Sequence, residues 1–389
     1  MLPVVCFNLR HTRMEPLFTR NETSETDRLL TENSARVEYS LDMLSKFGET
    51  DISPCLRNNT ISSTELFGNG LAITIVSVSR VTSVAGQTYY PKYLIQTVAK
   101  FLELLNKTSD INVQLSVCNV DQQPERHHDM TSLPKWLPVN QRANTSYDKS
   151  LNYNALLDKE KQDYVYCIER LLATNMTYIM LVEDDALPNE NLFKVLKNIF
   201  RQMKQTNLGS HIGAPRDEFS YIKLYHPERL VGYISLESVR ILELISTALV
   251  FTMTMLTLER LVLDRYSSNV SNGYSRIYIL ALFTYFILVA LCLDRYNILQ
   301  LRRISNNLYY LTPAPSCCTP AILFSRKGAT TVSSYLRGVT CKKGFAKDTA
   351  LDKLVLKQKL YPKLVEPNLF KHIGHFSSLR NGFIDPYIM

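Results

Sequence analysis

The sequence predicts an α/β fold built around a parallel β-sheet. Between residues 71 and 205, three short apolar runs rich in β-branched residues each precede a longer segment whose apolar side chains recur with helical spacing. Repeated strand–helix order of this kind is typical of a parallel sheet covered by helices. The 389 residues, 46% of them hydrophobic, suffice for a sizeable core in one large domain or two.

The first half of the chain supplies most of these elements. Residues 1–65 are polar and form a stem-like region with one amphipathic helix candidate at 35–47. Residues 66–240 form the first part of the folded domain, and the run LAITIVSVS at 71–79 is its clearest strand. We predict strands at 71–79, 111–121 and 177–182, and helices at 88–106, 155–173 and 191–205.

Two apolar segments then interrupt the domain. Leu244–Leu258 carries no charge, and neither does Ile277–Leu293, which is apolar on every face. A membrane span takes about 20 residues, so both segments are marginal in length, and two buried core helices are the alternative. We predict a transmembrane hairpin over 241–295. Because two spans return the chain to the side it left, the flanking segments share one compartment and form one domain.

The second part of that domain covers residues 296–389. Here AILFSRKGATTVSSYLRG predicts a strand followed by a helix, and GFAKDTALDKLVLKQK predicts another helix. The hairpin loop carries Arg260, Arg265 and Arg276, which favours a cytosolic loop, although three arginines beyond the second segment weaken that signal. At the N-terminus, the apolar run of MLPVVCFNLRHTR is too short for a signal peptide.

Composition narrows the class of protein and its compartment. The net charge of +8 comes from scattered Lys and Arg, which argues against nucleic-acid binding and suits an anionic substrate or a membrane surface. An excess of glycosylation sequons favours a secretory lumen. The cysteines show no zinc-ligand spacing, and those outside the apolar segment and the N-terminus form an even set available for disulfides. The sequons are at Asn21, Asn58, Asn106, Asn144, Asn175 and Asn269, and the cysteines are Cys55, Cys118, Cys167, Cys317, Cys318 and Cys341.

The stretch LVEDDALP places three consecutive carboxylates directly behind the apolar strand TYIMLV. Glu183, Asp184 and Asp185 repel one another, so we expect a positive partner unless the cluster is a solvated turn that caps the helix starting at Asn191. In α/β folds ligands bind beyond the carboxyl ends of the strands. Carboxylates there suit hard cations such as Mg²⁺ or Mn²⁺, which take oxygen ligands and share them with phosphates. The position therefore favours a metal and diphosphate site.

Two further groups of residues carry possible chemistry. Asp348 and Asp352 lie four apart in KDTALD and so share a helix face, although Asp348 is equally well explained as a helix cap. His372 and His375 lie among apolar residues in KHIGHFSS, where a buried structural histidine is the plainer interpretation.

Five separate motifs, in one order, resemble the Golgi post-GPI-attachment N-acetylgalactosamine (GalNAc) transferase family, which decorates glycosylphosphatidylinositol (GPI) anchors. They are VEDDA, LYHPERLVGY, CCTPAILF, KGFAKDTALD and VEPNLFKHIGHFSSLR, and the resemblance covers roughly residues 65 to 385. It implies a GT-A glycosyltransferase domain with an inserted transmembrane hairpin, lumenal in the Golgi membrane. It also implies transfer from UDP-GalNAc to the first mannose of the GPI glycan. The family normally has a further membrane segment near its N-terminus, which this sequence does not show.

The resemblance also implies roles for individual residues. Glu183 or Asp184 contacts the ribose or diphosphate of the donor, and Asp185 holds Mn²⁺ or Mg²⁺. His372 matches a C-terminal histidine directed at the metal or diphosphate. Because an α-linked donor gives a β-linked product, the reaction inverts and needs one base, which we assign to Asp348 with Asp352 as its substitute. The alternatives are a transferase that uses another donor, such as UDP-GlcNAc, and a non-catalytic GPI-binding membrane protein.

Overall fold

The structure is a computed structural model that describes residues 22–48, 64–84, 87–108, 111–142, 152–209, 219–234, 237–266, 275–377 and 382–383. The chain divides into two compact units. One comprises Thr26–His226 and Ser305–Met389, and the other comprises Met1–Glu25 and Pro227–Ile304.

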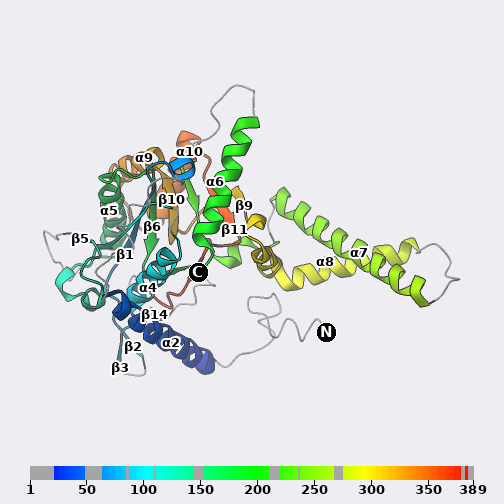
Figure 1. Ribbon diagram of the computed structural model, residues 1–389, viewed down its shortest axis with the longest axis horizontal. Coiled ribbons are helices and arrows are strands. Elements are labelled where there is room, and N and C mark those ends of the chain that lie inside the picture. Colours follow the sequence, from blue (N-terminus) through cyan, green and yellow to red (C-terminus); the bar gives the residue numbers. More distant parts are fainter. Residues whose placement is uncertain are drawn as a thin grey trace. The chain divides into compact units, whose positions relative to one another are not determined.

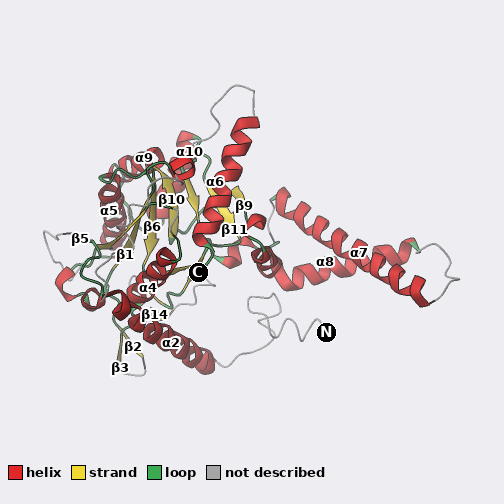
Figure 2. Ribbon diagram, in the orientation of Figure 1, coloured by secondary structure: helices red, strands yellow, loops and turns green. Residues whose placement is uncertain are grey.

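The larger unit is built on an eight-stranded mixed sheet of order β5-β4-β1-β6-β10-β8-β11-β9 (Figures 1 and 2). The pairings make six strands run in one direction, while β10 and β9 run the other way. The strands are β1 (Leu71–Ser77), β4 (Val113–Asn119), β5 (Val139–Gln141), β6 (Tyr178–Glu183), β8 (Tyr221–Lys223), β9 (Tyr310–Pro313), β10 (Ala321–Ser325) and β11 (Lys363–Glu366).

Helices cover both faces of this sheet. Along β6, Met180 and Val182 belong to the core shared with α4 and α6, while Ile179 and Leu181 belong to the core shared with α5, α9 and α10. This alternation follows from the two-residue period of a strand, and it yields a three-layer α/β/α arrangement (Figure 1). The helices are α4 (Tyr93–Asn106), α5 (Tyr153–Leu172), α6 (Leu192–Gly209), α9 (Arg326–Arg337) and α10 (Lys347–Gln358).

Smaller elements complete this unit. The predicted helix at 35–47 is part of a longer helix, α2 (Glu22–Gly48), and α3 spans Thr64–Phe67. Three pairs of short strands lie outside the main sheet: β2 (Thr82–Val84) with β3 (Gln87–Tyr89), β7 (Ala186–Pro188) with β12 (Phe370–His372), and β13 (Phe376–Ser377) with β14 (Gly382–Phe383). Short 3-10 turns of this unit occupy Pro124–Arg126, His128–Ser132 and Asn306–Leu308, while those at Glu228–Val231 and Gln300–Ile304 belong to the smaller unit.

The α/β prediction is confirmed, with one correction to the sheet. We expected a parallel sheet, but β10 pairs antiparallel with both β6 and β8. The apolar run AILFS indicates a buried strand whichever way it points, so its direction could not be inferred from composition. The chain reaches β10 after the excursion through residues 227–304, and not through a single crossover helix.

The smaller unit contains the two long apolar helices, α7 (Ser238–Tyr266) and α8 (Arg276–Leu299). They lie side by side (Figure 2). The rings of Phe251 and Phe286 stack, with their centroids 5.7 Å apart. Ser238–Val262 and Arg276–Ile304 are long and apolar enough to cross a membrane. Only 11% of the most apolar window of each is buried in the protein, whereas a core helix would be mostly covered.

Cysteines and sequons divide between described and undescribed parts of the chain. A buried disulfide joins Cys118 of β4 to Cys167 of α5, and a second joins the neighbours Cys317 and Cys318. Cys341 is buried as a free thiol. Asn106 and Asn175 are exposed. Cys55 and the sequons at Asn21, Asn58, Asn144 and Asn269 lie outside the described residues.

Candidate active site

The three carboxylates lie at the carboxyl edge of the sheet. Glu183 is the last residue of β6, and Asp184 and Asp185 form the turn that leads into β7. Because β1 and β4 run parallel to β6, their ends meet at the same edge. A cavity of about 510 Å³ opens there. Its lining includes Ser77, Arg80, Asp121, Glu160, Tyr164, Glu183, Asp184, Asp185, Lys347, His372 and Gly374.

Arg80 is a positive partner that the acidic stretch required. Its guanidinium lies 2.6 Å from Asp184 Oδ1 and 2.7 Å from Asp185 Oδ2, and it also donates to the main-chain oxygen of Phe376 at 3.0 Å. Burial by itself lowers the pKa of an arginine, but the two aspartates outweigh burial and raise the pKa of Arg80. The alternative of a turn capping α6 is therefore wrong, since β7 separates the cluster from that helix.

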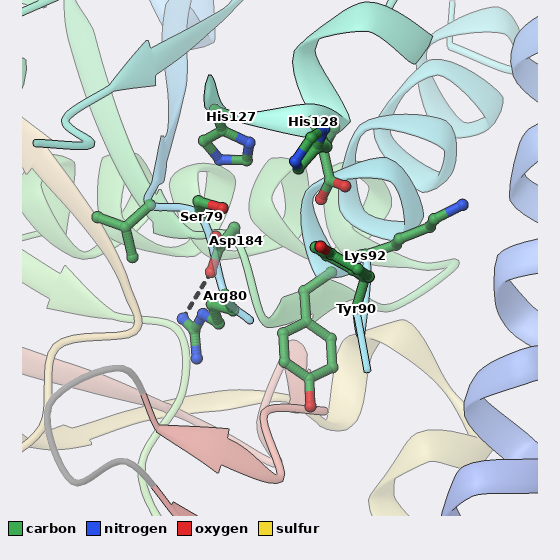
Figure 3. Close-up of a pocket in the computed structure, with 10 residues that line it drawn as sticks. Ser79, Arg80, Tyr90, Lys92, His127, His128 and Asp184 are labelled. Atoms are coloured by element: carbon green, nitrogen blue, oxygen red, sulfur yellow. Dashed lines mark hydrogen bonds and ion pairs between the residues drawn. The ribbon is translucent and has the colours of Figure 1, made fainter. Parts of the chain in front are cut away.

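Asp184 is held entirely by the protein. Its Oδ2 accepts a hydrogen bond from Ser77 Oγ at 2.8 Å, its Oδ1 is paired with Arg80, and its main-chain oxygen accepts from Thr97 Oγ1 at 2.6 Å. On the far side of Ser77, His127 Nε2 lies 2.9 Å from the same hydroxyl. Figure 3 shows the Arg80 guanidinium pointing toward Asp184, with His127 beyond it. Burial raises the pKa of Asp184, and Arg80 opposes that rise.

Asp185 faces His372 across a short gap. The β7–β12 pairing sets His372 opposite Ala186, and the main-chain N–H of Ile373 donates to the main-chain oxygen of Asp185 at 2.8 Å. His372 Nε2 then lies 3.6 Å from Asp185 Oδ1, a buried oxygen with no hydrogen-bond partner among the described residues. Burial favours a higher pKa for Asp185, but Arg80 and His372 outweigh it and the pKa is lowered. Asp185 is therefore an anion with one uncommitted oxygen.

This uncommitted pair fits a divalent cation. A carboxylate oxygen and an imidazole nitrogen are both good ligands for Mn²⁺, and metal–ligand distances near 2 Å let one ion contact two atoms 3.6 Å apart. The absence of a side chain at Gly374 leaves room for Asp185: a Cβ on this residue would lie 2.1 Å from Asp185 Oδ2. A buried polar atom without a partner is costly, which is a further reason to expect a ligand at Asp185 Oδ1.

Glu183 has a second cation, Lys347, from the start of α10. Lys347 Nζ lies 3.3 Å from Glu183 Oε1 and 3.0 Å from Glu160 Oε1, and it covers the ring of Tyr164 at 4.7 Å. Burial lowers the pKa of a lysine, but the two glutamates outweigh it and the pKa of Lys347 rises well above its usual value. Arg80 and Lys347 are therefore fixed cations that pair with the three carboxylates of the predicted motif.

Asp348 and Asp352 share a face of α10, but neither lines the cavity. Asp348 does not cap the helix, which begins after Ala346. Its two oxygens accept hydrogen bonds from the main-chain N–H of Cys318 and from Thr319 Oγ1, both at 3.0 Å, and Asp352 accepts from the main chain of Cys317. The turn that they hold continues into Pro320, whose oxygen accepts from the N–H of Glu183 at 2.7 Å. Both aspartates thus hold the turn that hydrogen-bonds to the end of the acidic strand.

A family model described as GPI-N-acetylgalactosamine transferase PGAP4 matches residues 71–371, which is more than half of the chain. The chain belongs to this family. The matched range contains the acidic motif, Lys347, Asp348 and Asp352, and it ends one residue before His372. The resemblance predicted from sequence is confirmed, and membership of the PGAP4 family implies a GPI-related GalNAc transferase activity.

Several residues of the candidate site in this PGAP4 family member were missed by sequence reasoning. Arg80 follows the end of β1 and Lys347 precedes Asp348, so the same strand-end rule and the same motif contained the signal for both. Ser77 and Gly374 gave none, because a serine or a glycine in isolation points to no particular neighbour. His375 is not among the residues that line the cavity, and its main-chain N–H donates to Tyr93 Oη at 3.0 Å.

Proposed function

We propose that this chain transfers GalNAc from UDP-GalNAc to the first mannose of GPI anchors, forming a β linkage with the help of a divalent cation. The supporting observation is the pair formed by buried Asp185 and partly buried His372 at the carboxyl edge of the sheet of a PGAP4 family member. A cavity of about 510 Å³ there lies within the range of about 300 to 1,000 Å³ that small-molecule and cofactor sites occupy.

Asp185 and His372 are the residues that would hold Mn²⁺ or Mg²⁺. A bound cation would neutralise the diphosphate of the donor and so assist its departure. The other carboxylates have different tasks in this proposal. Glu183 lines the cavity with one oxygen paired to Lys347 and is the donor-contacting residue of the motif. Asp184, whose side-chain oxygens are both taken by Ser77 and Arg80, fixes Arg80 in place.

The transfer itself requires one proton acceptor. A hydroxyl oxygen of the mannose attacks the anomeric carbon of GalNAc, the bond from that carbon to the UDP oxygen breaks, and the hydroxyl proton passes to a carboxylate. We keep Asp348 as the proposed base and Asp352 as its substitute. Their hydrogen bonds to the Cys317–Thr319 turn define a competing role as anchors of that turn, and the two roles predict different mutant kinetics.

The exposed apolar helices α7 and α8 support a membrane location for this activity. We propose that they form a transmembrane hairpin inserted in a GT-A type catalytic domain, and that the domain faces the Golgi lumen. Only 11% of the most apolar window of each helix is buried in the protein, as expected for surfaces that meet lipid. A domain held at the bilayer in this way would meet the acceptor, which is itself a lipid-anchored glycan, close to the membrane.

Donor choice is tested with the purified protein, a GPI glycan acceptor and Mn²⁺. UDP release and acceptor mass are followed with UDP-GalNAc and, in parallel, with UDP-GlcNAc at equal concentration. The proposal predicts acceptor-dependent transfer from UDP-GalNAc at a kcat/KM well above that for UDP-GlcNAc. Preference for UDP-GlcNAc would replace the donor assignment. Binding of the GPI glycan with turnover of neither donor would support the non-catalytic alternative.

A further inference from the structure

Arg80 occupies the position between Asp184 and Asp185 that a cation would otherwise share. The two aspartates offer four carboxylate oxygens. Arg80 takes Asp184 Oδ1 and Asp185 Oδ2, at 2.6 and 2.7 Å, and Ser77 takes Asp184 Oδ2 at 2.8 Å. Asp185 Oδ1 is therefore the one oxygen of the two aspartates without a hydrogen-bond partner among the described residues.

Arg80 is firmly held in this position. Its side chain is 15% exposed, it donates to the main-chain oxygen of Phe376, and its guanidinium carbon lies 5.3 Å from the centre of the Tyr93 ring. The aspartates that it bridges are 3% and 4% exposed. Moving Arg80 aside would leave two buried carboxylates without their common cation, which is strongly unfavourable.

We propose that Arg80 is a resident cation that keeps the affinity of the empty site for divalent metal low, so that metal binds tightly only together with the nucleotide diphosphate. The proposal rests on the proposed function, because it concerns the same metal site. It assigns Arg80 as a positioning residue: it acts on metal and donor through Asp184 and Asp185.

The number of metal ligands is the first argument that metal binds weakly without the diphosphate. Hard cations of this kind take about six ligands, of which the described protein supplies two, Asp185 Oδ1 and His372 Nε2. Water can fill the remaining positions, but water adds no negative charge. A diphosphate supplies anionic oxygens at the same edge of the sheet, where the cavity opens.

The charge of Arg80 is a second, independent argument that metal binds weakly without the diphosphate. A divalent ion bound at Asp185 Oδ1 would be close to the guanidinium that contacts the other oxygen of the same carboxylate, and like charges at that range repel strongly in a buried site. The phosphate anions compensate both cations at once. Arg80 therefore couples metal binding to donor binding, and it favours release of the metal together with UDP after transfer.

The test measures Mn²⁺ binding directly, by the electron paramagnetic resonance signal of free Mn²⁺, on the purified full-length protein in detergent. Parent protein and Arg80→Met are titrated with Mn²⁺ in the absence and in the presence of saturating UDP. We expect the parent to bind Mn²⁺ about tenfold or more tightly with UDP than without it. Arg80→Met should bind Mn²⁺ about tenfold or more tightly than the parent when UDP is absent, and UDP should then add little.

Two further variants keep the result interpretable. Arg80→Lys retains the charge but not the fork that spans both aspartates, and should bind Mn²⁺ without UDP at an intermediate level. Asp185→Asn in the Arg80→Met background should remove the gain in Mn²⁺ affinity that Arg80→Met alone shows without UDP. If Arg80→Met proves unstable in a thermal melt, the Arg80→Lys titration is the test of whether Arg80 lowers the affinity for Mn²⁺ without UDP.

Parent protein that binds Mn²⁺ equally well with and without UDP would overturn the coupling. So would Arg80 variants whose affinity without UDP equals that of the parent. Both results leave the transferase assignment intact. Absence of Mn²⁺ binding in the parent even with UDP would overturn the metal assignment itself, and that result is distinct from the first two.

Discussion

Lys347 Nζ lies 3.3 Å from Glu183 Oε1, although 164 positions separate the two residues in the chain. The contact links the first turn of α10 to the last residue of β6, and so ties the segment after the apolar helices to the acidic strand end. Lys347 is 5% exposed and also neutralises Glu160 at 3.0 Å. It is thus a structural cation of the cavity, matched by Arg80 on the other side of the motif.

Replacing Lys347 by Met should destabilise the protein by about 3 kcal/mol, because it leaves two partly buried glutamates without their shared cation. Chemical denaturation of the larger unit in detergent measures the change. Lys353→Met is the matched control on the same helix, since Lys353 is exposed and contacts the ring of Phe345. Equal, small effects of the two substitutions would contradict the assigned role.

If Asp348 is the base, Asp348→Asn and Thr319→Val should differ in their effect on kcat. Asp348→Asn should lower kcat by roughly 10²- to 10⁴-fold, the usual contribution of general base catalysis. Thr319→Val removes the hydrogen bond to Asp348 Oδ1 without removing the carboxylate, and should change kcat little. Steady-state kinetics on both variants separates the two roles. A similar modest loss in both would identify Asp348 as an anchor of the Cys317–Thr319 turn.

Gly374→Ala should disturb the Asp185–His372 pair, because the new Cβ would come within 2.1 Å of Asp185 Oδ2 and force the Asp185 side chain to move. We expect a destabilisation of about 1 to 3 kcal/mol, typical of overpacking, and a clear loss of Mn²⁺ affinity in the presence of UDP. Gly338→Ala serves as the control, since the nearest atom to its Cβ would be 3.5 Å away. Unchanged metal affinity in Gly374→Ala would argue against Asp185 as a metal ligand.

The buried His127 predicts a loss of stability in acid. Burial lowers the pKa of His127 to about 4, well below the value of about 6.5 in an unfolded chain. Between these values the unfolded chain binds a proton that the folded chain does not, so stability falls as pH decreases from about 6.5 to 4. This one group contributes about 2 to 3 kcal/mol of that fall. Denaturation of the parent and His127→Gln at pH 7 and pH 4.5 checks it: the variant should lose less stability in acid.

Much of the fold was readable because each main strand carries its own signal. β1 and β6 are runs of mostly apolar and β-branched residues, so burial on both faces predicted a strand at each place, although β1 ends at Ser77 and not at the predicted residue 79. The same rule placed Glu183, Asp184 and Asp185 at the ligand-binding edge. The direction of β10 and the short β7–β12 pair were not readable, because strand pairing depends on contacts between segments far apart in the chain.

The partners within the site were harder to predict than its location. The sequence shows three adjacent anions and therefore a need for positive charge, but it does not show which of 44 Lys and Arg residues supplies that charge. In sequence order Arg80 lies before the motif and Lys347 after it, and tertiary packing brings both to it. The same holds for Gly374, whose necessity appears only when Asp185 is seen beside it.

The most direct test of the central claim is the HexNAc side chain on GPI glycans. Cells lacking the endogenous enzyme receive the parent protein, Asp185→Asn, or the control Glu190→Gln, whose side chain is 76% exposed. Released GPI glycans are then analysed by mass spectrometry at equal protein expression. We predict a HexNAc side chain with the parent and with Glu190→Gln, and none with Asp185→Asn. Absence of HexNAc with the parent, or its full retention with Asp185→Asn, would contradict the account.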